Sequence, residues 1–338
     1  MGKFGKLGKE TLKMKKANLK LNRWAKELGY RVVTGDPRLL NEVGEVLERR
    51  KNNGEIDQRF FEENLSLFDG LPDRRIGPRE TLILVAVPRP AHILTFETET
   101  RPIELLLPPT YHSYRPLFEE VRKNLMENVF EKTARLKMII IPLKSLAVRL
   151  GLATYGRNNL TYIPEFGSYY QLVGYIVDKV LPYSSPAAGR LEIAAEACRR
   201  CLACRKACPR GAIGEDRFLL HAEKCYTLDS ESSRPFPAGT LSPSPHCIIG
   251  CLKCQEVCPM NKNRMIYEKA GVSLSKEETE SILESDDRNS FSGSSISSKF
   301  AALGLSESTA ILLRNFRYLV NVQKSTRICP PRLNRSHR

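Results

Sequence analysis

The placement of its cysteines constrains this chain more than any other feature of the sequence. Nine of the ten cysteines fall between residues 198 and 258, and only Cys329 lies outside that stretch. A secreted protein held together by disulfides distributes its cysteines through a short chain, whereas closely spaced C-x2-C pairs in an intracellular protein are typical of metal or cluster binding. The pattern therefore predicts a metal-binding segment in an intracellular protein.

The cysteines form two runs that both end in Cys-Pro. The first run has the spacing C-x2-C-x2-C-x3-C-P and consists of Cys198, Cys201, Cys204 and Cys208. The second run has the shorter spacing C-x2-C-x3-C-P and consists of Cys251, Cys254 and Cys258. The first spacing is that of bacterial ferredoxins with two [4Fe–4S] clusters, in which the cysteine before proline ligates the other cluster. We therefore expect two [4Fe–4S] clusters that exchange ligands between the runs.

This exchange divides the cysteines into two sets of ligands. Cluster one takes Cys198, Cys201, Cys204 and Cys258. Cluster two takes Cys208, Cys251 and Cys254. It lacks a fourth thiolate, and the spacing leaves both Cys225 and Cys247 as candidates. A zinc ribbon needs only two pairs of ligands, so two interlocked runs favour clusters over Zn²⁺.

The composition is that of a protein that folds in water. The chain has 338 residues, of which 41% are hydrophobic and 27% are charged, and its formal net charge is +15. No segment approaches the ~20 uncharged apolar residues that cross a bilayer, and the lysine-rich start lacks the apolar centre of a signal peptide. We expect a cytoplasmic protein that does not contact a membrane. The positive charge favours phosphate contact, although no familiar RNA-binding pattern accompanies it.

Strand and helix patterns alternate before the cysteines and predict a domain with mixed α and β structure. Apolar runs rich in β-branched residues indicate strands, and apolar residues at helical spacing indicate helices. The predicted strands are 30–34, 81–88, 92–96, 102–107 and 137–141. The predicted helices are 37–65, interrupted by a turn at 52–54, together with 117–132 and 144–152.

Composition along the chain suggests four segments. They are a basic N-terminal segment at 1–30, an α/β domain at 31–190, a double-cluster module at 191–262, and a linker with a short helical C-terminal segment at 263–338. Within the last segment, residues 276–299 are polar, acidic and then serine-rich, which is typical of a linker or mobile loop. Helical character returns at 301–322.

Several motifs carry a resemblance to a known family. CRRCLACRKACPRGAI, EKCYTL and GCLKCQEVCPMNK resemble the double-cluster module of epoxyqueuosine reductases, the cobalamin-dependent enzymes of tRNA queuosine maturation, which are related to reductive dehalogenases. Upstream, GLATYGRNNLTYIPEFGSYYQLVGYIVD at 151–178 is similar to the glycine loop and the Phe-Gly-Ser strand of that family. The resemblance implies an α+β fold, in which a corrinoid-reductase-like α/β domain carries an inserted or appended ferredoxin-like module and a short helical C-terminus.

The resemblance also implies which residues bind the cofactors. It makes Cys225 the fourth ligand of cluster two and leaves Cys247 unused. It places a corrinoid, which is cobalamin in this family, beside Gly151, Tyr155, Gly156, Arg157, Asn158, Phe166, Gly167 and Ser168. Glycines in such a loop let backbone N–H groups approach an anionic or amide group, and an arginine can pair with an anion.

The chain departs from the family at the proton donor. Epoxyqueuosine reductases carry a catalytic aspartate in the strand before the glycine loop, and the aligned position here is near Lys137. No Asp or Glu occurs from Lys132 to Pro164. The candidates to replace the acid are Tyr155, Lys137 and Tyr111, because tyrosine and lysine can donate a proton when burial tunes their pKa.

Three functions follow from these observations. The first is an oxygen-sensitive oxidoreductase, in which a ferredoxin or flavodoxin reduces the clusters and these pass electrons to a base-off cobalamin that reduces a small-molecule or tRNA substrate. The second is a ferredoxin-type electron-transfer protein without cobalamin, which the missing aspartate favours. The third is a tRNA-modifying epoxyqueuosine reductase proper, for which the positive charge would serve contact with phosphate.

Overall fold

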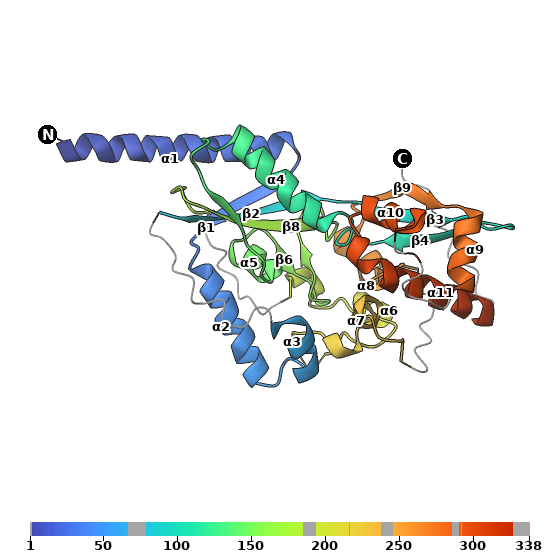
Figure 1. Ribbon diagram of the computed structural model, residues 1–338. Coiled ribbons are helices and arrows are strands. Elements are labelled where there is room, and N and C mark those ends of the chain that lie inside the picture. Colours follow the sequence, from blue (N-terminus) through green and yellow to red (C-terminus); the bar gives the residue numbers. More distant parts are fainter. Residues whose placement is uncertain are drawn as a thin grey trace.

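The computed structural model describes residues 2–66, 79–184, 194–215, 217–237, 246–285, 291 and 293–326. Helices and strands are mixed along the chain, and the strands form sheets of four, three and two strands. The two larger sheets lie in the middle of the molecule, with helices around them and the cysteine-rich segment beneath (Figure 1). A fold with mixed α and β structure, as predicted from the sequence, is therefore confirmed.

The four-stranded sheet has the order β1-β2-β8-β5, and all neighbouring strands are antiparallel. Its members are β1 (Arg31–Gly35), β2 (Thr81–Pro88), β8 (Tyr170–Val177) and β5 (Leu136–Met138). Every residue of β8 and all but the last residue of β2 are buried. Both faces of these central strands are covered, which explains why they read as continuous apolar runs rather than as alternating patterns.

Helices cover both faces of this sheet (Figure 1). They are α1 (Gly2–Glu27), α2 (Leu39–Asn52), α4 (Tyr114–Asn128) and α5 (Leu143–Arg149), whereas α3 (Gln58–Asn64) lies away from the sheet. The buried residues Leu117, Val121 and Leu125 form an apolar stripe on α4 that joins the main core. The turn predicted at 52–54 separates α2 from α3. Across the described parts of the chain, no helix combines the length and apolar character needed to cross a membrane.

The buried strand predicted at 137–141 is wrong in its extent. β5 ends at Met138 and forms an edge of the sheet, and none of its three residues is buried. Ile139 and Ile141 are buried, whereas Ile140 between them is 76% exposed. Within this apolar run, side chains therefore alternate between the core and solvent, which the sequence does not show.

The three-stranded sheet joins segments that lie far apart in the sequence. It has the order β4-β3-β9 and consists of β3 (Ala91–Phe96), β4 (Ile103–Leu107) and β9 (Tyr267–Leu274). β3 and β4 form an antiparallel hairpin, whereas β9 pairs in parallel with β3. The sequence does not reveal β9, because most of its residues are partly or fully exposed and its apolar pattern is weak.

The prediction of a linker or mobile loop over 276–299 is wrong for the residues described there, and its residues 286–290 and 292 lie outside the described part of the chain. Helices occupy most of this segment and continue beyond it, as α9 (Lys276–Glu284), α10 (Ser295–Ala302) and α11 (Thr309–Thr326). Ser275 caps α9 in a capping box with Glu278, and Ser294 caps α10. The serines and acids that suggested a loop therefore serve as helix caps and first-turn residues. The buried faces of these helices form a second core with β3 and β4, while the predicted domain boundaries stay predictions.

Candidate metal centre

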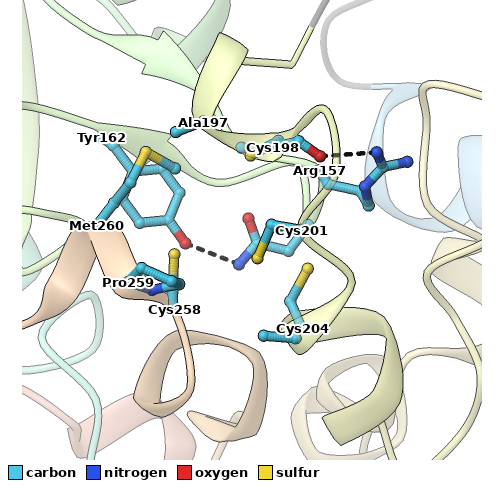
Figure 2. A pocket seen from close by; sticks show the side chains of 12 residues that line it. Arg157, Tyr162, Ala197, Cys198, Cys201, Cys204, Cys258, Pro259 and Met260 are labelled. Carbon is cyan, nitrogen blue, oxygen red and sulfur yellow. Dashed lines mark hydrogen bonds between the residues drawn. The ribbon is translucent and has the colours of Figure 1, made fainter.

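Four cysteines from the two runs line one cavity (Figure 2). They are Cys198, Cys201 and Cys204 of the first run and Cys258 at the end of the second run. The cavity is partly open to solvent. No three His, Cys, Asp or Glu side chains of the described segments are arranged to hold a single metal ion. Four thiols around a cavity fit a [4Fe–4S] cluster, in which each thiolate binds a different iron atom.

Short helices followed by proline position these thiols. α6 (Ala203–Ala207) and α8 (Lys253–Glu256) pack against each other, and each carries a cysteine from the middle of its run. Cys208 and Cys258 follow these helices in extended conformations, with ψ angles of 113° and 122°. The proline after each of them requires an extended residue at this position. As a result, the last thiol of each run turns away from its own run.

A second group of thiols consists of Cys208, Cys225, Cys251 and Cys254. Burial, followed by the charges of Cys225 and Cys208, raises the pKa of Cys251 to about 11. Burial, followed by the charge of Cys251, also raises the pKa of Cys254. The Sγ atom of Cys208 accepts a hydrogen bond from the backbone N–H of Ala212 at 3.3 Å. Thiolates in such a buried group need a compensating cation, which cluster iron would provide.

Cys247 lies in a different environment. It is 2% exposed and packs in a small apolar cluster with Ala91, Leu106 and Leu252. Its backbone forms a β-bridge with Leu106 of β4. These placements favour Cys225 over Cys247 as the fourth ligand of cluster two, and the assignment stays a prediction.

The glycine loop is a hairpin that lies against the first cysteine run. Its strands β6 (Thr154–Tyr155) and β7 (Thr161–Tyr162) pair antiparallel. Arg157 Nη2 donates to the backbone carbonyl oxygen of Cys198 at 2.8 Å. A Cβ atom on Gly156 would lie 2.5 Å from the ring of Tyr162. Glycine is therefore needed here so that the Tyr162 ring can pack against the turn.

Asn159 ties this loop to the segment between the two cysteine runs. Its Nδ2 donates to the Phe218 carbonyl oxygen at 2.9 Å, and its Oδ1 accepts from the backbone N–H of Leu220. Its φ angle of 55° lies in the left-handed region, which asparagine adopts more readily than most residues. The sequence analysis missed Asn159. The Asn-Asn pair after the glycine was the signal that could have found it.

The Phe-Gly-Ser segment contacts the end of the second run. The backbone N–H of Ser168 donates to Asn261 Oδ1 at 2.8 Å, and its hydroxyl donates to Gln255 Oε1 at 2.8 Å. Gly167 has a φ angle of 59°, and a Cβ atom there would overlap Asn261 Oδ1. This segment therefore anchors the end of α8 to the main sheet, because β8 begins two residues after Ser168.

The residues predicted to contact a corrinoid have protein partners in this structure. Arg157 and Asn158 line the cysteine cavity, and Ser168 is hydrogen-bonded to the second run. Phe166 lies under the Arg31 guanidinium, 5.6 Å from the ring centroid, and Gly151 is exposed. The buried Nε of Arg157 is a polar atom without a hydrogen-bond partner. These contacts fit the support of a cluster, and the contact of these residues with a corrinoid stays a prediction.

The three candidate proton donors lie at different places, and none lines the cysteine cavity. Tyr111 donates to Glu231, and burial, followed by the charge of Glu231, raises its pKa well above the ordinary value. The Tyr155 hydroxyl lies 3.0 Å from Ser145 Oγ, and burial raises its pKa. Lys137 is exposed on β5. Glu231, which accepts the Tyr111 hydrogen bond and whose pKa is raised by desolvation, was missed by the sequence analysis.

A family comparison matches the cysteine-rich segment. Residues 197–261 match the family described as a 4Fe-4S double cluster binding domain. This range contains both cysteine runs and the cysteines between them. The sequence prediction of an iron–sulfur segment is therefore confirmed.

Curated relatives extend the similarity beyond this segment. Epoxyqueuosine reductase of Salmonella typhimurium is 31% identical over 134 residues, which cover 39% of this chain and 33% of the relative. Epoxyqueuosine reductase of Cyclobacterium marinum is 31% identical over 147 residues, which cover 43% of this chain and 45% of the relative. The chain resembles the epoxyqueuosine reductases. It spans less than half of the length of these curated relatives.

Solved structures of epoxyqueuosine reductases share the fold over most of the chain. The Bacillus subtilis structure has a TM-score of 0.64 at 17% identity and covers 92% of this chain and 82% of its own. The Streptococcus thermophilus structure has a TM-score of 0.65 at 19% identity and covers 90% of this chain and 81% of its own. Another, with an epoxyqueuosine-modified tRNA stem loop, has a TM-score of 0.58 at 17% identity and covers 93% and 86%. At these identities the likeness shows the fold alone.

Proposed function

We propose that this chain is an iron–sulfur oxidoreductase of the epoxyqueuosine reductase type, with two [4Fe–4S] clusters and epoxyqueuosine in tRNA as its substrate. One observation carries the proposal: cysteines from both runs line a single cavity. Three of these thiols come from the first run and one from the end of the second. Ligand exchange between two Cys-Pro runs is the arrangement of proteins that hold two such clusters.

The proposed ligand sets assign four thiolates to each cluster. Cluster one is held by Cys198, Cys201, Cys204 and Cys258, and cluster two by Cys208, Cys225, Cys251 and Cys254. Each cluster accepts one electron at a time, so the two clusters together hold two electrons. Removing an epoxide oxygen as water and leaving an alkene consumes two electrons and two protons, which matches this capacity.

Two observations support tRNA as the substrate. The relatives are named epoxyqueuosine reductases, and one structure with the same fold is in complex with an epoxyqueuosine-modified tRNA stem loop. The net charge of +15 favours contact with a phosphate backbone. The chain covers less than half of the length of the curated relatives, so the tRNA substrate is part of what we propose.

The electron donor and the acceptor are further parts of this proposal. A ferredoxin or flavodoxin supplies single electrons to the clusters. A corrinoid, when bound, supplies a strongly reducing cobalt centre. We assign Arg157, which donates to the Cys198 carbonyl oxygen, to the support of cluster one. Cobalt content measures independently whether a corrinoid accompanies the clusters.

The test is the iron, sulfide and cobalt content of protein purified without oxygen from cells supplied with cobalamin. About eight irons per chain are expected. The reduced protein is then incubated with tRNA that contains epoxyqueuosine, and queuosine is measured by mass spectrometry of the nucleosides. Protein without iron would reject the cluster proposal. About eight irons with no queuosine would reject the substrate.

A second candidate is a ferredoxin-type electron-transfer protein without a corrinoid. It is favoured by the position aligned with the family's aspartate, which is near Lys137 on the exposed edge strand β5. About eight irons without cobalt, together with electron transfer to an acceptor such as cytochrome c and no reaction with tRNA, would support this candidate. One cobalt per chain would reject it.

A further inference from the structure

Tyr162 and Asn158 lie between the two groups of cysteines. Both residues are buried, and both line the cavity of cluster one together with Cys258. Figure 2 shows the Tyr162 hydroxyl directed toward the Cys258 sulfur atom, and the side-chain amide of Asn158 donates to this hydroxyl. The pair therefore occupies the wall between thiols that the proposed ligand sets assign to different clusters.

In this pair Asn158 is the donor and the Tyr162 hydroxyl oxygen is the acceptor. Asn158 Nδ2 donates to the Tyr162 hydroxyl oxygen at 2.9 Å. Because that oxygen accepts, its own hydrogen is left for Cys258, which lines the same cavity and toward which the hydroxyl points in Figure 2. The backbone N–H of Leu160 donates to Asn158 Oδ1 at 3.4 Å, which fixes the orientation of the amide.

The other amide hydrogen of Asn158 completes the chain of hydrogen bonds. Asn158 also acts on Cys254 of the second run, because its side chain lowers the pKa of this thiol against the larger effect of burial. Nδ2 carries two hydrogens, so one can bind the Tyr162 oxygen and the other the Cys254 sulfur. A continuous path thus runs from Cys254 through Asn158 and Tyr162 to Cys258.

The hairpin holds both side chains in place. Tyr162 belongs to β7 and pairs with Thr154 of β6, while Asn158 lies in the turn between these strands. The Tyr162 ring rests on Gly156, where no Cβ atom could fit without displacement. Both polar groups are thus pre-oriented toward sulfur before any cluster binds.

We propose that Tyr162 and Asn158 are positioning residues that set the reduction potentials of the two clusters. Tyr162 acts on cluster one through Cys258, and Asn158 acts on cluster two through Cys254. A hydrogen bond to a ligating sulfur offsets its negative charge, and so stabilises the reduced cluster more than the oxidised one. This inference rests on the proposed function, because it needs clusters at these cysteines.

The test is a redox titration of the full chain, purified without oxygen and followed by electron paramagnetic resonance, with iron measured on the same samples. Tyr162→Phe removes the hydroxyl and keeps the ring. We expect the midpoint potential of cluster one to become more negative by about 59 mV, which is a tenfold change in the equilibrium constant of a one-electron couple. Iron should stay at about eight per chain. Asn158→Leu should shift cluster two in the same direction.

Tyr170→Phe is the matched control. Tyr170 is also buried, but its hydroxyl donates to Thr161 Oγ1 at 2.6 Å rather than to a thiol. This variant should keep both potentials at the values of the unmodified protein. Unchanged potentials in Tyr162→Phe, or an equal shift in Tyr170→Phe, would overturn the inference. Loss of half the iron in Tyr162→Phe would overturn it as well, since the hydroxyl would then be needed for cluster binding. Unmodified protein without iron would instead reject the proposed function.

Discussion

The side-chain amide of Asn315 donates to the backbone carbonyl oxygen of Ser230 at 2.8 Å and so joins α11 to the cysteine-rich segment. The same nitrogen donates to the carbonyl oxygen of Ile248 at 2.8 Å. Both carbonyls lie between Cys225 and Cys251, and Asn315 is 1% exposed. A C-terminal helix thus fixes the spacing between two proposed ligands of cluster two.

Replacing this amide should destabilise the protein. In Asn315→Ala the buried carbonyl oxygen of Ile248 loses its donor and that of Ser230 keeps only the longer bond from Arg314 Nη2. We therefore expect the free energy of unfolding to fall by about 2–4 kcal/mol. Urea denaturation followed by circular dichroism measures the change. Asn128→Ala is the control, because Asn128 is exposed and donates to the Asn124 carbonyl within α4. It should change the free energy by about 0.5 kcal/mol or less, and an equal loss in both variants would contradict the prediction.

The exchange of ligands predicts which cysteines act together. Cys204→Ser and Cys258→Ser should each remove the same cluster and leave about four irons per chain, although the two residues belong to different runs. The same paramagnetic signal should disappear in both variants. Cys225→Ser should remove the other signal. Cys247→Ser should keep about eight irons, and a loss of half its iron would show that Cys247 is the fourth ligand of cluster two.

Alanine substitutions at Gly167 and Gly54 separate the cost of backbone strain from the cost of steric overlap. Both glycines have positive φ angles, 59° and 68°, but a Cβ atom on Gly167 would overlap Asn261, whereas nothing lies within 4 Å of one on Gly54. Gly54→Ala should therefore cost only backbone strain, about 1 kcal/mol. Gly167→Ala should cost about 3 kcal/mol, because it also displaces the amide that binds Ser168. Thermal denaturation of both variants checks this, and equal midpoints would contradict it.

The paired histidines predict a loss of stability in acid. His92 and His112 stack with ring centroids 3.9 Å apart, and burial, followed by the charges of His92 and Arg89, lowers the pKa of His112 to about 4 from 6.5. Between these values the unfolded chain binds a proton that the folded chain does not. Stability should therefore be complete above pH 6.5 and fall as the pH drops toward 4. Melting temperatures across this range measure the slope, which His112→Gln should reduce; an unchanged slope would contradict the assignment.

Features that depend on local spacing could be predicted from the sequence. The cysteine runs predict a cluster-binding segment because a cubane cluster needs ligands at fixed short intervals. The core strands β2 and β3 are apparent because their residues are apolar throughout or nearly so. The same reasoning predicted too long and too buried a strand at β5, because an apolar run does not distinguish an edge strand from a central one.

Features that depend on distant partners could not be predicted. β9 carries little apolar signal of its own and forms because β3 offers an unpaired edge. The polar helices α9 and α10 bury single residues such as Ile282 and Phe300 against that sheet. At the candidate metal centre, asparagine in a loop (Asn159) and tyrosine in a strand (Tyr162) are common residue types. They become functional candidates only because the fold brings the cysteine-rich segment against them.

The parallel pairing of β3 with β9 has a consequence for synthesis. Residue 91 leaves the ribosome long before residue 267, and at typical rates of about 5–20 residues per second the interval is roughly 10–35 s. During this time the hairpin of β3 and β4 has an open edge, while every cysteine of both runs emerges into the cell. The second core cannot close until β9 arrives. Until α11 is also made, Asn315 cannot hold the segment between Cys225 and Cys251, so iron supply during translation would influence how many chains reach the native state.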